Sequence, residues 1–240
     1  SDVCSYEVVP EKWSPFSILQ MIADPGSSQC ASSSTEVSGV SATDNVSAIT
    51  ASLSSAEKSA TRYHALIDTG ALITGLTNYE VAKTLLYKCA YLSSWCEGVV
   101  FLDEYDRKMI LVKATGRVLK LQQCGIPVEK RFAFYDQVHT TGMDIQHVIN
   151  AKAILTLSKD MVFRDFAQGA FRMRGIAKGQ TIHILIIPEV RDLIMRELKK
   201  CGDAYRVGNW MLEKSSVSET TAVLQDINAW LVLNSMRSKY

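Results

Sequence analysis

The chain has 240 residues, of which 47% are hydrophobic and 21% charged, and its formal net charge is +1. This composition suits a globular domain with one core, and it excludes both a disordered polyelectrolyte and a strongly basic nucleic-acid binder. No apolar run approaches the ~20 residues of a membrane helix, so we expect no membrane partner. The chain begins Ser1-Asp2-Val3 without a methionine, as a piece of a longer protein would.

The beginning of the chain divides into two stretches by composition. Residues 1–24 contain scattered apolar side chains and predict a short extended lead-in followed by a helix near residues 15–23. Residues 25–61 are dominated by Ser, Thr, Ala and Gly, and they contain no aromatic residue. Because such a stretch cannot bury enough apolar surface to offset its ordering entropy, we predict a disordered insertion there.

From residue 62 onward, apolar runs alternate with helical spacing. Five runs predict buried strands, at 65–68, 98–102, 131–135, 153–157 and 181–187. Helical spacing predicts four helices, at 78–91, 161–173, 189–201 and 219–237. Short segments at 108–112 and 118–121 predict a hairpin-like addition. This alternation predicts an α/β domain over 62–203, with a mostly parallel sheet covered by helices on both faces, and a C-terminal helical extension over 204–240.

Ligands of such sheets bind where loops leave the carboxyl ends of the strands. We therefore expect function in the loops that follow Asp68, Leu102, Tyr135 and Leu157.

Two motifs in these loops carry a resemblance to a known family. After the strand at 131–135 comes a loop with Thr141, Gly142 and Asp144, which resembles motif V of superfamily-2 helicases. Further on, the series Gln168, Arg172 and Arg174 resembles motif VI. The usual pattern there is Gln-x-x-Gly-Arg-x-Gly-Arg. Here Phe171 replaces the first Gly, and the second Arg falls one place early.

This resemblance implies the second RecA-like lobe, of the P-loop NTPase type, of a superfamily-2 helicase or SecA-like motor. It implies that Arg172, Arg174 and Gln168 face a nucleotide cleft, where a guanidinium offsets charge in phosphoryl transfer. It also implies that Thr141, Gly142 and Asp144 shape a loop facing nucleotide or nucleic acid. The alternative is that the two arginines pair with Asp165, Asp160 or another carboxylate and hold their helix in place.

The sequence lacks the parts of a complete ATPase. No Gly-x-x-x-x-Gly-Lys-Ser/Thr loop is present. The run Asp103-Glu104-Tyr105-Asp106 has the letters of a magnesium-binding box, but it lies too close to motif V for that role, and we predict a solvated strand end facing Arg107 and Lys108. We therefore expect no cofactor in isolation, and ATP with Mg only if another lobe of the same long chain completes the cleft.

A second resemblance implies a different activity. The stretch 65–190 is similar to a domain of very large, uncharacterised eukaryotic proteins that are grouped with ubiquitin thioesterases. This implies a cysteine-type deubiquitinase, for which Cys124 and His139 are the pair to test. A third possibility is a degenerate scaffold without either activity. Nucleic acid and ubiquitin therefore both stay open as partners.

The cysteines and histidines add little beyond that pair. Six cysteines form no C-x-x-C motif, and the chain is long enough to need no disulfide. We expect reduced thiols and a cytoplasmic or nuclear location. The four histidines are too dispersed to indicate a metal site.

Overall fold

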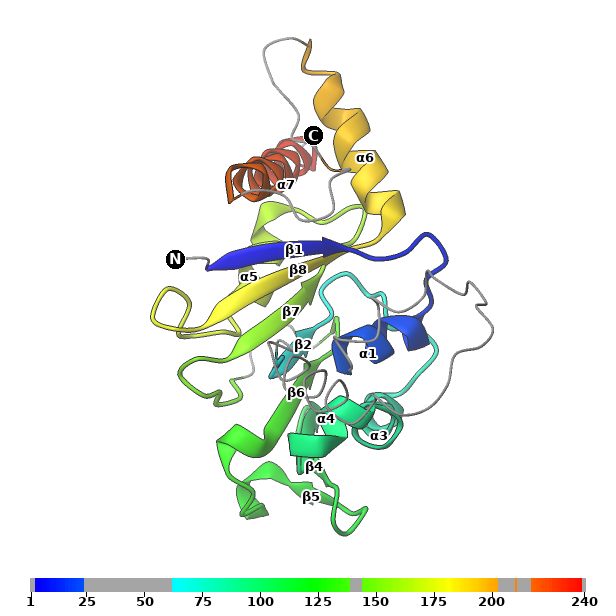
Figure 1. Ribbon diagram of the computed structural model, residues 1–240, viewed down its shortest axis with the longest axis vertical. Helices are drawn as coiled ribbons and strands as arrows, with labels where there is room; N and C mark the ends of the chain where they lie inside the picture. Colours follow the sequence, from blue (N-terminus) through cyan, green and yellow to red (C-terminus); the bar gives the residue numbers. More distant parts are fainter. Residues whose placement is uncertain (1–2, 24–61, 139–143, 203–209, 211–216, 239–240) are drawn as a thin grey trace, which may run out of the picture.

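The protein is described by a computed structural model that covers residues 3–23, 62–138, 144–202, 210 and 217–238. Its strands form one eight-stranded sheet in the order β1-β8-β7-β2-β6-β3-β4-β5 (Figure 1). The strands are β1 (Cys4–Val8), β2 (Ala65–Ile67), β3 (Gly98–Leu102), β4 (Lys108–Val112), β5 (Val118–Lys120), β6 (Arg131–Tyr135), β7 (Lys152–Thr156) and β8 (Thr181–Ile186). The helices are α1 (Pro15–Ala23), α3 (Asn78–Lys88), α4 (Ala90–Trp95), α5 (Phe163–Ala170), α6 (Pro188–Lys199) and α7 (Val217–Arg237).

The sheet is mostly parallel, as the alternation of strands and helices predicts. Strands β1, β8, β7, β2, β6 and β3 run parallel to their neighbours, and the hairpin β4–β5 extends the β3 edge in antiparallel fashion. Every residue of β3 is buried, which explains why its sequence is a continuous apolar run rather than an alternating one. The α/β class is thus confirmed.

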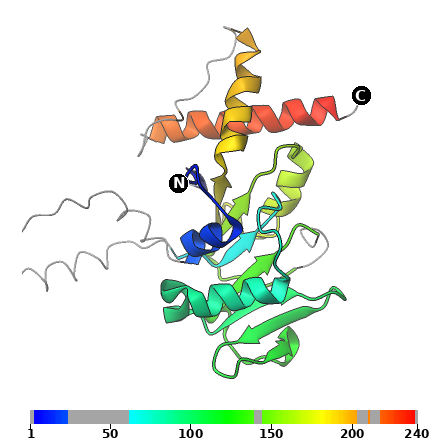
Figure 2. The same ribbon diagram turned by 90° about the vertical axis from the view of Figure 1, so that its right-hand side faces the viewer.

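Helices cover both faces of this sheet. Helices α1, α3 and α4 lie on one face, and α5 lies on the other (Figures 1 and 2). Helices α6 and α7 pack against each other at the β1 end of the sheet, where α7 also contacts α5 and β1. Tyr135, Ile67 and Leu155 are in register across β6, β2 and β7, so their side chains point to the same face. Gly169 of α5 faces Ile67 and Leu155, which identifies this as the α5 face.

The first residues of the chain are part of this sheet and core. Strand β1 pairs with β8 along its whole length, from Cys4 opposite Ile182 to Val8 opposite Ile186. Ile18 and Leu19 of α1 are fully buried. The sequence predicts that residues 1–24 are a separate lead-in. It could not reveal that β1 pairs with the distant strand β8. The predicted insertion 25–61 lies outside the described residues.

Helix α7, in the predicted C-terminal extension, packs onto the domain through contacts with α5, α6 and β1. The Trp210 indole N–H donates to Asp226 Oδ2 of α7 at 2.8 Å, and Trp230 of α7 is fully buried.

Several helix boundaries differ from those that the sequence predicts. Asn78 has a side chain that could cap α3, but Thr77 caps the helix in a reciprocal capping box with Glu80. Asn78 instead donates its side-chain amide to the Leu102 carbonyl at 2.9 Å. The predicted helix 78–91 breaks at Cys89, where the backbone is extended, and continues as α4. The predicted helix 161–173 is shorter, because the chain enters turns after Ala170.

The phenylalanines of β6, of α5 and of the turn after α5 divide between core and surface. Phe132 and Phe134 are buried in β6, and Phe166 is partly buried against the core. Phe163 and Phe171, however, are 46% and 60% exposed. The short α5 turns only part of its surface to the sheet, which leaves these two rings at the surface.

A close approach of backbones fixes α5 on the sheet. A Cβ added at Gly169 would lie 2.4 Å from Thr69 Cγ2, whose rotamer is held because Thr69 Oγ1 donates to the Thr156 carbonyl at 2.7 Å. Alanine normally stabilises a helix relative to glycine, but here we expect Gly169→Ala to lower the free energy of unfolding by about 1–3 kcal/mol through overpacking. Urea denaturation measures this.

The second variant Thr69→Ser removes the obstructing methyl group and keeps the hydroxyl. Combined with Gly169→Ala, it should recover most of the lost stability. Gly125→Ala is the matched control, because a Cβ there meets nothing within 4 Å. Equal stability of wild type and Gly169→Ala would contradict this packing.

Candidate functional site

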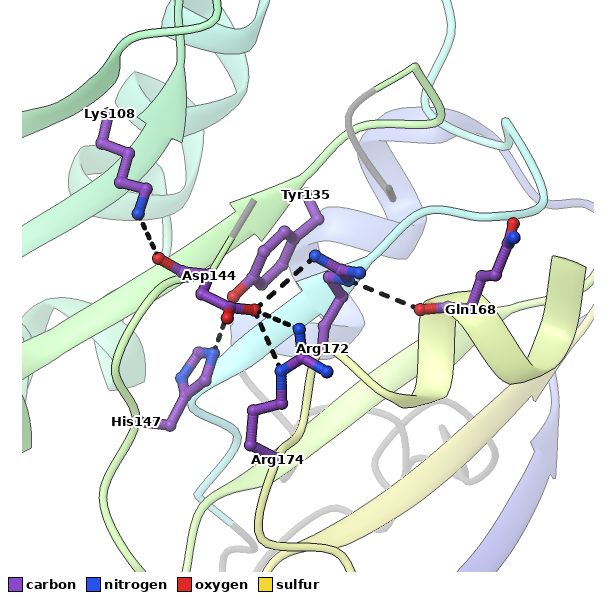
Figure 3. Close-up of polar contacts among 7 residues, drawn as sticks. All are labelled: Lys108, Tyr135, Asp144, His147, Gln168, Arg172 and Arg174. Carbon is purple, nitrogen blue, oxygen red and sulfur yellow. Dashed lines mark hydrogen bonds and ion pairs between the residues drawn. The ribbon is translucent and has the colours of Figure 1, made fainter. Parts of the chain in front are cut away.

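The two motifs singled out by the sequence meet in space. Arg174 donates from Nε and Nη2 to the same oxygen, Asp144 Oδ1, at 3.0 and 2.7 Å (Figure 3). Arg172 Nη1 lies 3.8 Å from that oxygen. We name Asp144, Arg172, Arg174 and Lys108 the arginine cluster. It joins the loop after β6 to the turns after α5.

Arg172 and Arg174 occupy different environments within this cluster. The Arg172 side chain is 8% exposed, whereas that of Arg174 is 60% exposed. Arg172 Nε donates to the backbone carbonyl of Gln168 at 3.4 Å, and the Gln168 side chain points away from the arginines in Figure 3. Gln168 therefore contacts Arg172 through its backbone carbonyl. The prediction that its side chain faces a nucleotide cleft stays a prediction.

The arginine cluster is positively charged overall. Lys108 of β4 donates from Nζ to the backbone carbonyl of Asp144. The hydrogen bond from Arg174, with the charges of Arg174, Arg172 and Lys108, lowers the pKa of the Asp144 carboxyl. Three cations thus surround the Asp144 carboxylate. A site of this charge is suited to a phosphate or another anion.

Residues that the sequence did not single out hold the two loops of the cluster. Tyr135, fully buried at the end of β6, shares a 3.0 Å hydrogen bond with His147 Nε2. Gln180 accepts from the Gly175 N–H at 2.7 Å and donates to the Val148 carbonyl at 2.9 Å. It thereby ties the turn after the arginines to the loop after Asp144. His147 lies in this loop.

Four predicted residues of the loop after β6 cannot be placed. His139, Thr140, Thr141 and Gly142 lie outside the described residues. Their predicted roles in a nucleotide-facing loop, and that of His139 as a base, stay predictions.

At the point of the sheet where ligands would be expected, a buried aspartate bonds to neighbouring groups of the protein. The connection from β2 leads toward β3 and that from β7 leads toward β8, so the connections diverge between β2 and β7. There Asp68 accepts from Thr156 Oγ1 at 2.6 Å and from the N–H groups of Leu72 and Ile73 at 3.0 and 2.9 Å. Burial raises the pKa of the Asp68 carboxyl, although these hydrogen bonds act in the opposite direction. We assign Asp68 a structural role.

The acidic run after β3 faces Arg107, as the sequence predicts, but Lys108 is directed to the Asp144 carbonyl instead. Asp103 Oδ2 pairs with Arg107 at 2.7 Å, and its other oxygen accepts from the N–H groups of Tyr105 and Arg107. These contacts stabilise a turn at the end of β3. They involve no group of the arginine cluster.

The contacts of the described residues do not pair Cys124 with a histidine. Cys124 is partly buried against the core at the end of a short 3-10 turn, Leu121–Gln123. The histidines in the described part of the chain have other partners: His64 contacts Lys152, His147 contacts Tyr135, and His183 contacts Ser5 and Glu7. The pairing of Cys124 with His139 stays untested.

Neither a metal site nor a membrane span is found in the part of the chain that the structure describes. No three His, Cys, Asp or Glu side chains of that part are grouped so that they could bind a metal ion. None of its helices combines the length and apolar character that crossing a bilayer requires. Comparisons with models of protein families, with curated proteins and with solved structures found no match.

Two partly buried histidines, His64 and His147, give a test of this fold. Desolvation lowers the pKa of His64 from 6.5 to about 4, and the charges of Arg62 and Lys152 act in the same direction. Desolvation also lowers the pKa of His147 to about 4. The unfolded chain therefore takes up these protons first, so stability falls as the pH drops from about 6.5 toward 4, by at most about 1.4 kcal/mol per pH unit for each histidine.

Urea denaturation at a series of pH values measures this slope. His147→Gln keeps a polar partner for Tyr135 but cannot titrate, so its slope should be shallower. Carboxyl groups titrate in both proteins, and the comparison isolates the imidazole. Identical slopes would contradict the burial of a neutral His147.

Proposed function

We propose that this chain is the second, RecA-like lobe of a motor-like unit, and that it presents Arg172 to a phosphate group held by another lobe of the same long protein. The observation that supports this most is the meeting of Asp144, Arg172 and Arg174. These residues belong to two motifs 24 or more residues apart, yet they form one cluster with excess positive charge. ATP and Mg would be held by the other lobe.

The two arginines are suited to separate tasks. Arg174 lies 2.7 Å from Asp144, so it neutralises that carboxylate and holds the loop after β6. Arg172 lies 3.8 Å from the same oxygen, and its largely buried guanidinium is oriented by the Gln168 carbonyl. A guanidinium fixed in a medium of low dielectric stabilises developing phosphate charge more than one in water. Arg172 is therefore the arginine finger of this proposal.

ATP hydrolysis by a longer polypeptide that includes the phosphate-binding lobe tests the proposal. Arg172→Ala should lower kcat by roughly a thousandfold or more, the effect of removing an arginine finger. Arg172→Lys should also lower it, because a lysine keeps the charge but lacks the planar fork. The chain of 240 residues alone should show no turnover.

Arg164→Ala is the control, because Arg164 lies on α5, the helix that precedes Arg172, and its side chain is 78% exposed. It should leave kcat unchanged. Thermal unfolding of each variant separates loss of fold from loss of function. Wild-type turnover in a folded Arg172→Ala variant would contradict the proposal, and absence of turnover in the wild-type two-lobe polypeptide would favour the degenerate scaffold.

A ubiquitin thiol hydrolase that uses Cys124 and His139 is the alternative, and it has its own test. If it holds, a ubiquitin-based suicide probe should label the wild-type chain and fail to label Cys124→Ala. Cys201→Ala is the control, because Cys201 is exposed and should add no specific labelling. No labelling of the wild type would remove this alternative for the chain.

A further inference from the structure

A hollow lies at the opposite ends of the strands from the arginine cluster. Strands β2, β6 and β7 run parallel and begin at Ala65, Arg131 and Lys152, and the hollow opens beside these amino ends. We name it the amino-edge pocket. Its volume of about 660 Å³ lies within the range of pockets that hold small molecules. No motif of the sequence pointed to it.

Two cationic side chains, Arg62 and Lys152, line the amino-edge pocket. The Arg62 guanidinium lies 4.6 Å from the centroid of the Trp95 ring, which positions it by a cation–π contact. Lys152 begins β7 next to it on the wall of the pocket. Within the described part of the chain, neither cation is paired with a carboxylate.

The histidines of this pocket supply neutral polar groups. The backbone N–H of Lys152 donates to His64 Nδ1 at 3.2 Å, so the proton of the neutral ring is on Nε2, which is then a donor. Arg62, His64 and Lys152 all line the pocket, and after desolvation the charges of the two cations lower the pKa of His64. His147 adds a second ring.

Charge and shape then indicate the kind of ligand. Glu129 is the single carboxylate among the residues that line the pocket, against the two cations. Val128, Val148 and Ile149 give the wall an apolar part, and Ile149 is 79% exposed. An anionic head would face Arg62 and Lys152, and an apolar body would cover the aliphatic side chains.

We propose that the amino-edge pocket binds a small organic anion, a phosphate ester or a carboxylate with an apolar body, through Arg62 and Lys152. This site is independent of the proposed function. It lies at the other ends of the strands, and its ligand needs no second lobe.

Two-dimensional NMR of the 240-residue chain tests this with four probes: phenyl phosphate, benzoate, inorganic phosphate and neutral benzamide. Phenyl phosphate or benzoate should shift the backbone signals of Glu129, Asn150 and Lys152. The tighter binder of phenyl phosphate and benzoate shows whether the pocket prefers a phosphate ester or a carboxylate. Inorganic phosphate shows how much affinity the anionic group provides without an apolar body. Benzamide should bind at least about tenfold more weakly, because it lacks the charge that strengthens hydrogen bonds to the cations.

Arg62→Gln and Lys152→Gln should each weaken binding by about tenfold, the effect of losing one charge-assisted hydrogen bond. Both side chains are exposed, so these variants should fold. The controls Arg117→Gln and Lys159→Gln change exposed cations outside the pocket and should bind as the wild type does. Equal binding of benzamide, equal weakening in the controls, or no shifts with either aromatic anion would each overturn the proposal.

Discussion

The buried carboxylate of Asp68 is the contact on which the arrangement of the site depends. It receives one hydroxyl and two N–H groups at the end of β2, a strand of three residues in the middle of the sheet. Thr156 of β7 is thereby held against β2, and Thr69 provides the surface on which Gly169 of α5 packs. Because α5 is fixed there, the turns that follow it deliver Arg172 and Arg174 to the loop after β6. The hydrogen bonds of Asp68, which has a structural role, thus set the position of Arg172 and Arg174.

The sequence leaves two roles open for the arginines, contact with a nucleotide and pairing with a carboxylate, and the arginine cluster is compatible with both. Arg174 pairs with Asp144, as the structural alternative requires, and this pairing lowers the pKa of the carboxyl. Arg172 is more distant from Asp144, and with Lys108 it leaves the cluster positively charged. The segment from Asp144 to Asn150 connects this cluster to the wall of the amino-edge pocket, and Gln180 braces it from the neighbouring turn. Both proposed sites therefore depend on one irregular stretch of chain.

Much of the fold could be predicted from local pattern, because buried parallel strands such as β3 appear as continuous apolar runs. The pairing of β1 with β8 could not, since it joins residues about 178 apart in sequence that carry no shared local signal. The resemblance to motifs V and VI singled out Asp144, Arg172 and Arg174, but it could not show that the three meet or that Arg174 takes the closer contact. Arg62, His64 and Lys152 escaped notice because they come together only when the amino ends of two strands are placed side by side.

The claim that Arg172 serves a phosphate on another lobe is tested most directly by a structure of the longer, two-lobe polypeptide with a non-hydrolysable ATP analogue. The proposal predicts an Arg172 guanidinium nitrogen within hydrogen-bonding distance, about 2.7–3.2 Å, of a γ-phosphate oxygen, with Arg174 still on Asp144. An analogue bound in the cleft while Arg172 points away from the phosphates would contradict it.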